Sequence, residues 1–515
     1  MQSFLTHHEA LVKGTLSGFD RVRFRGTLRW LASVRGLGAW MHRAHVLLRD
    51  FKGYAMDLTE TVNQTSRRLA EEAGRPAVYL ASSSVRKEDR ARQIAAADGI
   101  TSGLVCVLSA VEPCLTFTVG PNARSKRLEL RRHLGKCLHH YFYLIDSELG
   151  WLNVRLQTWL PFTIHIVING REWLARQLVR KGIGYQRQDN CFVDLAHVPR
   201  AQTLMDRQLR TRWPRLLGRL LRQVHPAHRE LFRPDRLDYY WSADETEWAT
   251  DVMFRSPDEL ARLYPRLLRH AISTFGGHDV LRFLGRRPCV QLFKTAELLT
   301  HLGRRVEGTR IKHTLDRNSL KMYDKQGSVL RIETTVNDAR GMKVFRAKET
   351  DPDGPASWQR LRKGVADLHR RAEVSQKANE RYLEALAAVE TEPTLAEASA
   401  TLCRRTTCHG RSVRALNPLA AEDARLLAAV SRGEFALHGF RNRDLCPLLC
   451  GQTALTARQQ MARTTRLIRL LRAHGLVQKV PATHRYLLSP RGRTTITALL
   501  AARGANTRKL TELAA

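Results

Sequence analysis

The chain has 515 residues, of which 43% are hydrophobic, and this composition suits a folded protein of roughly two to four domains. Its 85 Lys and Arg residues outnumber 49 Asp and Glu, and the net charge of +36 predicts a polyanionic partner, with nucleic acid favoured over an anionic membrane surface. The sequence contains no apolar run of about 20 residues and no apolar signal core at its start, so we expect neither a membrane span nor export.

Nine cysteines, an odd number, lie mostly in apolar strand-like segments, which is typical of reduced thiols in a cytoplasmic protein. A zinc site that joins two pairs near the C-terminus is one interpretation, although neither pair has the common C-x2-C spacing. Its ligands would be Cys403, Cys408, His409, Cys446 and Cys450. The sequence contains no Walker loop, Rossmann glycine fingerprint or serine-hydrolase elbow, which argues against nucleotide-driven motors and serine hydrolases.

Residues 1–136 are predicted to form a basic α/β region. It begins with a short helix, which is followed by a strand in GFDRVRFRGTLR, where the residues of one face alternate with Val22 and Phe24. That face carries Phe19, Arg21, Arg23 and Arg25. Its arginines are candidates for contact with a phosphate backbone, and exposure to solvent is the alternative. Further on, residues 103–120 are predicted to be two strands joined at Glu112 and Pro113.

Residues 137–350 are predicted to form a central α+β domain. Three strand-like segments between residues 137 and 169 follow one another with short loops, which favours an antiparallel meander, and a helix follows. The expected fold class is therefore α+β, with a mainly antiparallel sheet and helices on it. Residues 199–226 are predicted to be one long basic helix, in which Arg215 and Arg219 either contact nucleic acid or face solvent.

The densest group of acidic residues in this basic chain lies between Asp238 and Asp251. The segment is predicted to be a strand that leads into a short helix or a second strand. On a helix, Glu247 and Asp251 would share a face at i and i+4. Two carboxylates so placed are suited to Mg²⁺ or Mn²⁺, and neutralisation of nearby arginines is the alternative.

Residues 308–345 contain two alternating segments around Gln326-Gly327, which predicts a hairpin. A two-residue loop would set a polar face beside an apolar one, whereas a three-residue loop, residues 325–327, brings both polar faces together. We therefore expect the longer loop, with Gly327 in a left-handed conformation. The expected cross-strand pairs are Lys321 with Arg331 and Ser319 with Glu333.

Tyr323 lies on the same polar face, and this face has two interpretations. One is a solvated surface with cross-strand ion pairs, each worth roughly 0.2–1 kcal/mol. The other is a site that handles phosphate, because a Tyr hydroxyl can act as a nucleophile, a carboxylate can hold a metal, and Lys and Arg neutralise phosphate.

The strings SLKMYDK and LRIE in this hairpin resemble the YDK and LRxE hairpin of rolling-circle replication initiators from plasmids and filamentous phages. Those enzymes nick one DNA strand with a Tyr and a divalent metal. The initiators' motif of two histidines has no counterpart here, and its nearest equivalent is His165. More broadly, the chain resembles a family of basic bacterial proteins.

The resemblance implies a strand-nicking or strand-transferring enzyme of a mobile element. Tyr323 would be the nucleophile, and Lys321, Lys325 and Arg331 would hold the phosphate. The ligands of Mg²⁺ or Mn²⁺ would be Glu333 with Glu247 or Asp251.

Residues 351–420 are predicted to be a linker that begins with one long spacer helix from Trp358 to Thr391. Residues 421–515 are predicted to form a winged helix-turn-helix domain, with a helix from Thr456 to His474 and a two-stranded wing. Winged helices bind DNA, RNA or proteins. The candidate nucleic-acid contacts here are Arg458, Arg463, Arg466, Lys479 and Arg485.

The sequence thus predicts a cytoplasmic protein that binds DNA or structured RNA and does not enter a membrane. A metal-dependent nicking enzyme and a non-catalytic binder remain alternatives, and a plain transcriptional regulator is the third. The enzyme interpretation requires that the acidic group and the hairpin meet in space.

Overall fold

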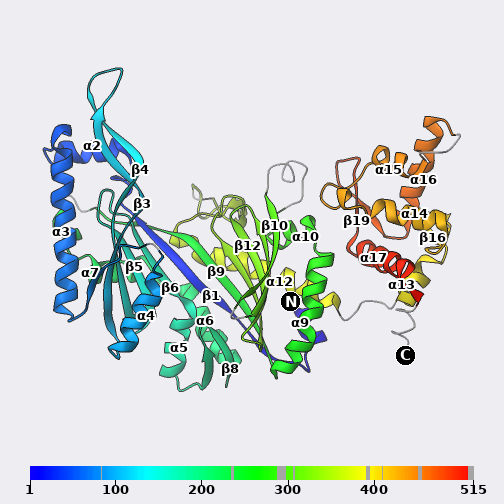
Figure 1. Ribbon diagram of the computed structural model, residues 1–515, viewed down its shortest axis with the longest axis horizontal. Helices are drawn as coiled ribbons and strands as arrows, with labels where there is room; N and C mark the ends of the chain where they lie inside the picture. Colours follow the sequence, from blue (N-terminus) through cyan, green and yellow to red (C-terminus); the bar gives the residue numbers. More distant parts are fainter. Residues whose placement is uncertain are drawn as a thin grey trace.

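The computed structural model describes residues 1–82, 84–232, 237–286, 297–305, 308–348, 350–389, 395–408, 410–450 and 455–507. One sheet of eleven strands organises most of the chain, in the order β10-β11-β12-β13-β9-β1-β6-β5-β4-β3-β2 (Figure 1). Neighbouring strands are antiparallel except β2, which runs parallel to β3. The strands are β1 (Val12–Thr27), β2 (Ala77–Tyr79), β3 (Gly103–Pro121), β4 (Leu128–Asp146), β5 (Gly150–Gln157), β6 (Ile164–Asn169), β9 (Tyr240–Phe254), β10 (Leu298–Arg305), β11 (Gly308–Leu315), β12 (Asn318–Lys325) and β13 (Val329–Val336). The expected α+β class and the antiparallel β4-β5-β6 meander are confirmed.

Helices cover the sheet and divide its apolar side chains into two large cores. The first core joins β1 and β3–β6 to the helices α2 (Val34–Arg43), α3 (Phe51–Glu72), α5 (Gly170–Arg180), α6 (Val198–Asp206) and α7 (Trp213–Val224). The second joins β9 and β11–β13 to α1 (Gln2–His7), α9 (Pro257–Thr274), α10 (Gly277–Phe283) and α12 (Leu368–Leu386). Across the described ranges, no helix combines the length and the apolar character needed to cross a bilayer.

The predicted spacer helix is shorter than expected and is not a spacer. Trp358 lies in a strand, β15 (Ser357–Arg360), which pairs with β14 (Lys343–Arg346), and α12 begins only at Leu368. The buried side chain of Asn379 in α12 donates to the carbonyl oxygens of Trp248 and Ile332 on neighbouring strands. The helix is thereby fixed to the sheet, because its polar as well as its apolar side chains find partners there.

Two further predictions from the first half of the chain are wrong in detail. The basic helix expected at residues 199–226 is divided into α6, a short 3-10 turn and α7, and Pro214 lies in the first turn of α7, where its missing N–H is harmless. Glu112 and Pro113 do not end a strand, because β3 continues through them to Pro121. The expected boundary between residues 136 and 137 falls inside β4, so both regions share one sheet.

The C-terminal part has its own apolar core, which includes Ile468, Leu471, Leu476 and Ile496. Its elements are α14 (Ala421–Val430), α15 (Asn442–Cys450), α16 (Ala457–Ala473), β18 (Val477–Lys479), β19 (Tyr486–Leu488) and α17 (Pro490–Gly504). Thr456 is the N-cap of α16 and forms a capping box with Gln459. This part contacts the sheet domain where Arg493 donates to the carbonyl oxygen of Thr274, 3.1 Å away.

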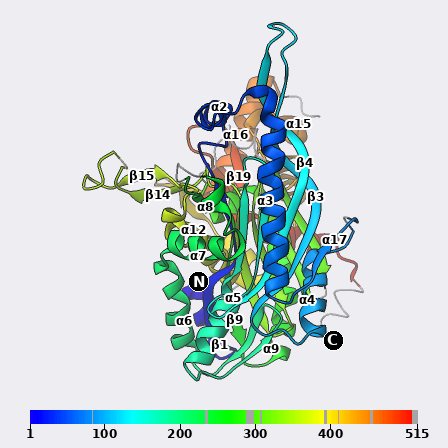
Figure 2. The same cartoon turned by 90° about the vertical axis from the view of Figure 1, so that its left-hand side faces the viewer.

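A two-stranded ribbon made by the ends of β3 and β4 projects beyond the helices in both views (Figures 1 and 2). The register holds to its tip, where Pro121 pairs with Leu128. A shorter hairpin, β14–β15, projects from another side of the sheet domain (Figure 2). Neither feature was expected from the sequence, because the first depended on β3 continuing through Pro113 and the second on Trp358 not being helical.

Candidate functional site

The β12–β13 hairpin has the expected three-residue loop and the expected shared polar face, but its register is shifted by two residues. Lys321 lies opposite Glu333, and Tyr323 lies opposite Arg331, whereas we expected Lys321 opposite Arg331. The loop is formed by residues 326–328, because Lys325 stays in the ladder and pairs with Val329. Gln326 and Gly327 both have positive φ, 57° and 71°, so the left-handed conformation expected at Gly327 is confirmed, and Gln326 shares it.

The acidic segment is one continuous strand, β9, so the helical alternative for Glu247 and Asp251 is wrong. β9 lies between β1 and β13 in the sheet. In this register Glu247 is beside Arg21 on β1, while Asp251 is beside Arg331 on β13. The tertiary structure therefore brings the acidic segment to the hairpin, as the enzyme interpretation requires.

Charged and polar side chains from five elements meet on one face of the sheet. We call this set the central ionic cluster, and its members are Asp20, Arg21, Arg171, Glu247, Asp251, Lys321, Tyr323, Arg331 and Glu333. It includes every candidate catalytic or metal-binding residue of the hairpin except Lys325. That lysine is buried close by and lies 3.8 Å from the carboxylate of Asp189.

One half of the cluster is centred on Lys321. Its ammonium lies 2.5 Å from Glu333 Oε1 and 3.4 Å from Glu247 Oε1. The hydroxyl of Tyr323 donates to the other oxygen of Glu333 at 2.6 Å, and the Tyr323 side chain is 6% exposed. Arg21 completes this half, with its Nε 3.2 Å from Glu247 Oε2. A single ammonium thus bridges the two carboxylates.

These contacts give Glu247 and Glu333 very different pKa values. Burial raises the pKa of Glu247 to about 7, and the charge of Glu333 adds to this effect. Burial acts on Glu333 too, but Lys321 and the Tyr323 hydroxyl outweigh it and hold its pKa at about 2. Burial, followed by the charge of Glu333, raises the pKa of Tyr323 well above its ordinary value. Glu333 is therefore a weak base, poorly matched to removing the phenolic proton.

The other half of the cluster is a buried group of two arginines and two aspartates. Arg331 donates to both carboxylate oxygens of Asp251, at 2.6 and 2.9 Å, and to Asp20 at 3.1 Å. Arg171, from the first turn of α5, lies 3.0 Å from Asp251 and 3.7 Å from Asp20. All four side chains are almost completely buried. The aspartates raise the pKa of Arg331 far above the value that its burial alone would give.

A turn between β7 (Tyr185–Gln188) and β8 (Cys191–Leu195) covers part of the cluster. The carbonyl oxygen of Asn190 accepts from Arg331 at 2.9 Å, and the Asn190 amide donates to Asp20 at 2.7 Å. A polar cleft of about 240 Å³ opens beside this turn. Its lining includes Asp20, Arg21, Asn153, Asn169, Glu172 and Glu247. Glu247 therefore faces a space that a ligand can enter, whereas Tyr323 does not line it.

The carboxylates expected to bind Mg²⁺ or Mn²⁺ do not fit that role as they are arranged. Glu247 and Asp251 are four residues apart on one strand, which separates them by roughly 13 Å. Lys321 occupies the position between Glu247 and Glu333, and Asp251 is bound by two arginines. Each carboxylate thus already has a cationic partner, which a metal ion would have to displace.

The basic face expected on β1 is formed by its arginines, but Phe19 does not belong to it. A bulge between Phe19 and Arg21 turns Phe19 into the core, where it packs against Trp248. Acidic residues on β9 compensate the arginines: Arg21 and Arg23 contact Glu245 at 2.7 and 3.4 Å. Arg25 approaches Asp244 at 3.9 Å. This face is therefore a mixed ionic surface.

The remaining predicted nucleic-acid contacts differ in whether they already have partners. Arg215, Arg458, Arg466 and Lys479 are exposed. Three others have partners: Arg219 contacts Asp146 at 2.7 Å, Arg463 contacts Glu422 at 2.6 Å, and Arg485 donates to the carbonyl oxygen of His438 at 3.0 Å. The exposed residues remain the stronger candidates for contact with phosphate.

The β3–β4 ribbon is a basic feature that was not expected from the sequence. Between Gly120 and Lys136 the chain has six Lys or Arg residues and one acidic residue, Glu129. All six cations are exposed: Arg124, Lys126, Arg127, Arg131, Arg132 and Lys136. The density of cations was visible in the sequence, but the projecting strand pair that presents them was not.

Asp20 and Arg171 were also missed, although each breaks a local pattern. Asp20 interrupts a strand that otherwise alternates apolar and basic residues. Arg171 lies in the first turn of α5, where the helix dipole disfavours a cation. Such a misplaced charge indicates a partner from elsewhere in the fold, but does not identify it.

Among the residues that the structure describes, the predicted C-terminal zinc ligands Cys403, Cys408, Cys446 and Cys450 do not form a metal-binding group. Cys446 approaches Gln460 and Cys450 approaches Thr464, while His409 lies outside the described residues. Among the described residues, the one group of three potential ligands is Cys114, Cys137 and His139.

The chain matches no protein-family model, and neither curated proteins nor solved structures gave a significant match.

Proposed function

We propose that the protein binds nucleic acid and that the β3–β4 ribbon is its principal contact with the phosphate backbone. The observation that carries this proposal is the exposed group of six cations on a projecting strand pair with one acidic neighbour. A two-stranded β-ribbon fits a DNA major groove, and ribbons also enter the minor groove. The net charge of +36 supports the same partner.

The ribbon is better suited to this role than the basic face of β1. Ion pairs on β9 already satisfy Arg21 and Arg23, so a phosphate would have to displace Glu245. On the ribbon the nearest comparable contact is weak, since Arg131 and Glu129 are 3.9 Å apart. A cation that neutralises a phosphate releases the counterions condensed on the nucleic acid, and a cation without a close carboxylate does this without first losing an ion pair.

The C-terminal part supplies a second basic surface, which we propose is a winged helix-turn-helix. Helix α16 would be the recognition helix, with Arg458 and Arg466 exposed along it. The β18–β19 pair would be the wing, with Lys479 exposed at its turn. The capped start of α16 and its apolar core contacts through Ile468 support a rigid helix in this position.

The β14–β15 hairpin supplies an aromatic surface suited to unpaired bases. Phe345 and Trp358 lie opposite each other with ring centroids 5.7 Å apart, and they are 61% and 66% exposed. Lys343 and Arg360 are exposed on the same strands. Exposed aromatic rings next to cations are the arrangement on which bases of single strands stack.

A salt titration of binding tests the ribbon proposal. A variant without three ribbon cations, Arg124→Gln, Lys126→Gln and Arg127→Gln, should bind a 30-base-pair duplex more weakly. The slope of log K against log salt should become shallower, with its magnitude reduced by about 2.7. The matched control removes three exposed cations from α9, as Arg262→Gln, Arg266→Gln and Arg269→Gln. If both variants lose the same affinity, binding follows net charge alone and the ribbon has no special role.

Strand nicking through Tyr323 is the second candidate, favoured by the 2.6 Å hydrogen bond between a potential nucleophile and Glu333. The burial of Tyr323 and the low pKa of Glu333 oppose it. Supercoiled plasmid incubated with the protein and Mg²⁺ or Mn²⁺ distinguishes the two functions. A pure binder leaves the plasmid intact, whereas nicking that Tyr323→Phe abolishes would establish the enzyme.

A further inference from the structure

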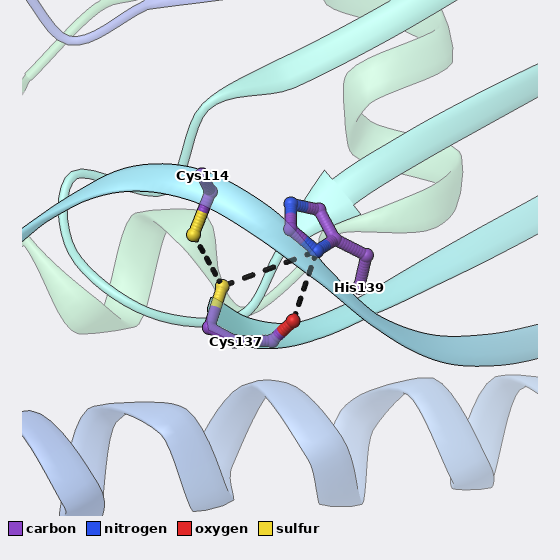
Figure 3. A group of neighbouring side chains, drawn as sticks. All are labelled: Cys114, Cys137 and His139. Carbon is purple, nitrogen blue, oxygen red and sulfur yellow. Dashed lines mark hydrogen bonds between the residues drawn. The ribbon is translucent and has the colours of Figure 1, made fainter. Parts of the chain in front are cut away.

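Two thiols and an imidazole meet where the β3–β4 ribbon joins the rest of the sheet (Figure 3). Cys114 lies on β3, and Cys137 and His139 lie on β4, two residues apart on one face of that strand. The two sulfur atoms are 3.1 Å apart, and His139 Nδ1 is 3.9 Å from Cys137 Sγ. One donor atom from each residue lies within 4.8 Å of the other two.

The imidazole is held in a form that suits ligation. His139 Nδ1 is 3.1 Å from the carbonyl oxygen of Cys137, and because a carbonyl only accepts, Nδ1 carries the proton. Nε2 is then the nitrogen with a lone pair, and it accepts from Arg155 at 3.2 Å. Metal-binding histidines commonly donate their second N–H to a backbone carbonyl in this way.

The neighbouring charges allow a metal to replace the arginine. Arg155 also contacts Glu112 at 2.9 Å, and Glu112 pairs directly with Cys137 across the two strands. If Arg155 releases His139 Nε2, it therefore keeps an ionic partner. Its positive charge would then lie beside two thiolates and stabilise them.

We propose that Cys114, Cys137 and His139 bind a zinc-class divalent cation, with one coordination position left open. Two sulfur ligands and one nitrogen ligand are the donor set that Zn²⁺ prefers. Tetrahedral Zn–S bonds of about 2.3 Å place two sulfur atoms roughly 3.8 Å apart, so the thiols need to separate by less than 1 Å. Binding forms two thiolate–metal bonds and one imidazole–metal bond and releases both thiol protons to solvent. The inference does not depend on nucleic-acid binding.

Titration of the reduced, metal-free full-length chain with Co²⁺, a spectroscopic substitute for Zn²⁺, tests the site. We expect one equivalent of Co²⁺ to give a thiolate-to-cobalt charge-transfer band that Zn²⁺ abolishes. Cys114→Ser and Cys137→Ser should each remove most of this band and weaken binding at least tenfold. Cys106→Ala is the matched control, because that buried thiol also lies on β3 but outside this group, and it should leave the band unchanged.

A second measurement does not require any variant to fold. Zn²⁺ should protect Cys114 and Cys137 of the wild-type chain from alkylation by iodoacetamide, as read by peptide mass spectrometry. The proposal is overturned if no charge-transfer band forms at one equivalent, or if the band survives in both Cys variants. It is also overturned if Zn²⁺ fails to protect the two thiols. The same holds if Cys114 and Cys137 form a disulfide and the chain still binds no metal after that disulfide is reduced.

Discussion

Arg331 holds Asp251 through a two-point contact, Nε to Oδ1 at 2.6 Å and Nη2 to Oδ2 at 2.9 Å, with both side chains buried. The contact joins β13 to β9, and the same guanidinium reaches Asp20 on β1. Three adjacent strands are thereby connected by one side chain. Because residues 20, 251 and 331 are far apart in sequence, this contact forms only when the centre of the sheet is assembled.

Replacing Arg331 should therefore destabilise the protein strongly. Arg331→Leu leaves two buried carboxylates with Arg171 alone, and we expect a loss of about 3–5 kcal/mol in the free energy of unfolding. Arg331→Lys should recover little, because an ammonium cannot make the two-point contact. Urea unfolding followed by circular dichroism measures the free energy of unfolding of both variants. The control Arg68→Ala removes an exposed ion pair with Glu72 and should cost less than about 1 kcal/mol. Equal losses would contradict this role for Arg331.

The raised pKa of Glu247 predicts a fall in stability as pH rises toward neutrality. Its pKa of about 7 in the folded chain lies above the ordinary value, so the folded state binds this proton more tightly than the unfolded state does. The resulting stabilisation is complete below the ordinary pKa and is lost as pH rises through 7, by up to ~3 kcal/mol. Glu333 acts in a separate window, because its lowered pKa makes its contribution disappear only as pH falls toward 2.

Unfolding measured from pH 5 to pH 8 should show this loss in the wild type and a flatter profile in Glu247→Gln. Glu245→Gln is the matched control, since it removes a carboxylate on the same strand that contacts Arg21 and Arg23. A wild-type profile that rises across this range would show that another group dominates the pH dependence.

Tyr323 should act through stability rather than through chemistry. Tyr323→Phe removes a buried hydrogen bond to the ionised Glu333, which is worth about 1.5–3 kcal/mol, and should leave affinity for nucleic acid unchanged within twofold. Thermal unfolding and fluorescence anisotropy measure the two quantities. Tyr79→Phe, at an exposed position, should change neither. Unchanged stability together with lost strand nicking would instead favour the enzyme.

The aromatic hairpin should contribute to the binding of unpaired bases. Trp358→Ala should weaken binding of a single-stranded oligonucleotide by roughly 5- to 150-fold, the equivalent of one stacked base, and should affect duplex binding much less. Tyr79→Ala removes an exposed aromatic ring from β2 and serves as the control. If single-strand affinity is the same in both variants, bases do not stack on this hairpin.

Local patterns were sufficient for much of the fold but not for its pairings. Alternation placed Ser319, Lys321 and Tyr323 on one face, because successive side chains of a strand always point to opposite sides. Alternation cannot place the turn, so the pairs were predicted two residues away from where they form. A shift of two residues keeps every side chain on its face, and the polar face was therefore predicted although its contacts were not.

What the sequence determined by itself was the antiparallel meander of β4 to β6, the start of helix α16, the excess of cations and the charged face of the hairpin, because each depends on near neighbours in the chain. Only the tertiary structure decided which charges remain available. Pairing of β1 with β9 set Glu245 against Arg21 and Arg23, and pairing of β3 with β4 left six exposed cations on a ribbon with one acidic residue among them. Coulomb energy depends on distance in space, and folding sets that distance for residues that are far apart in sequence.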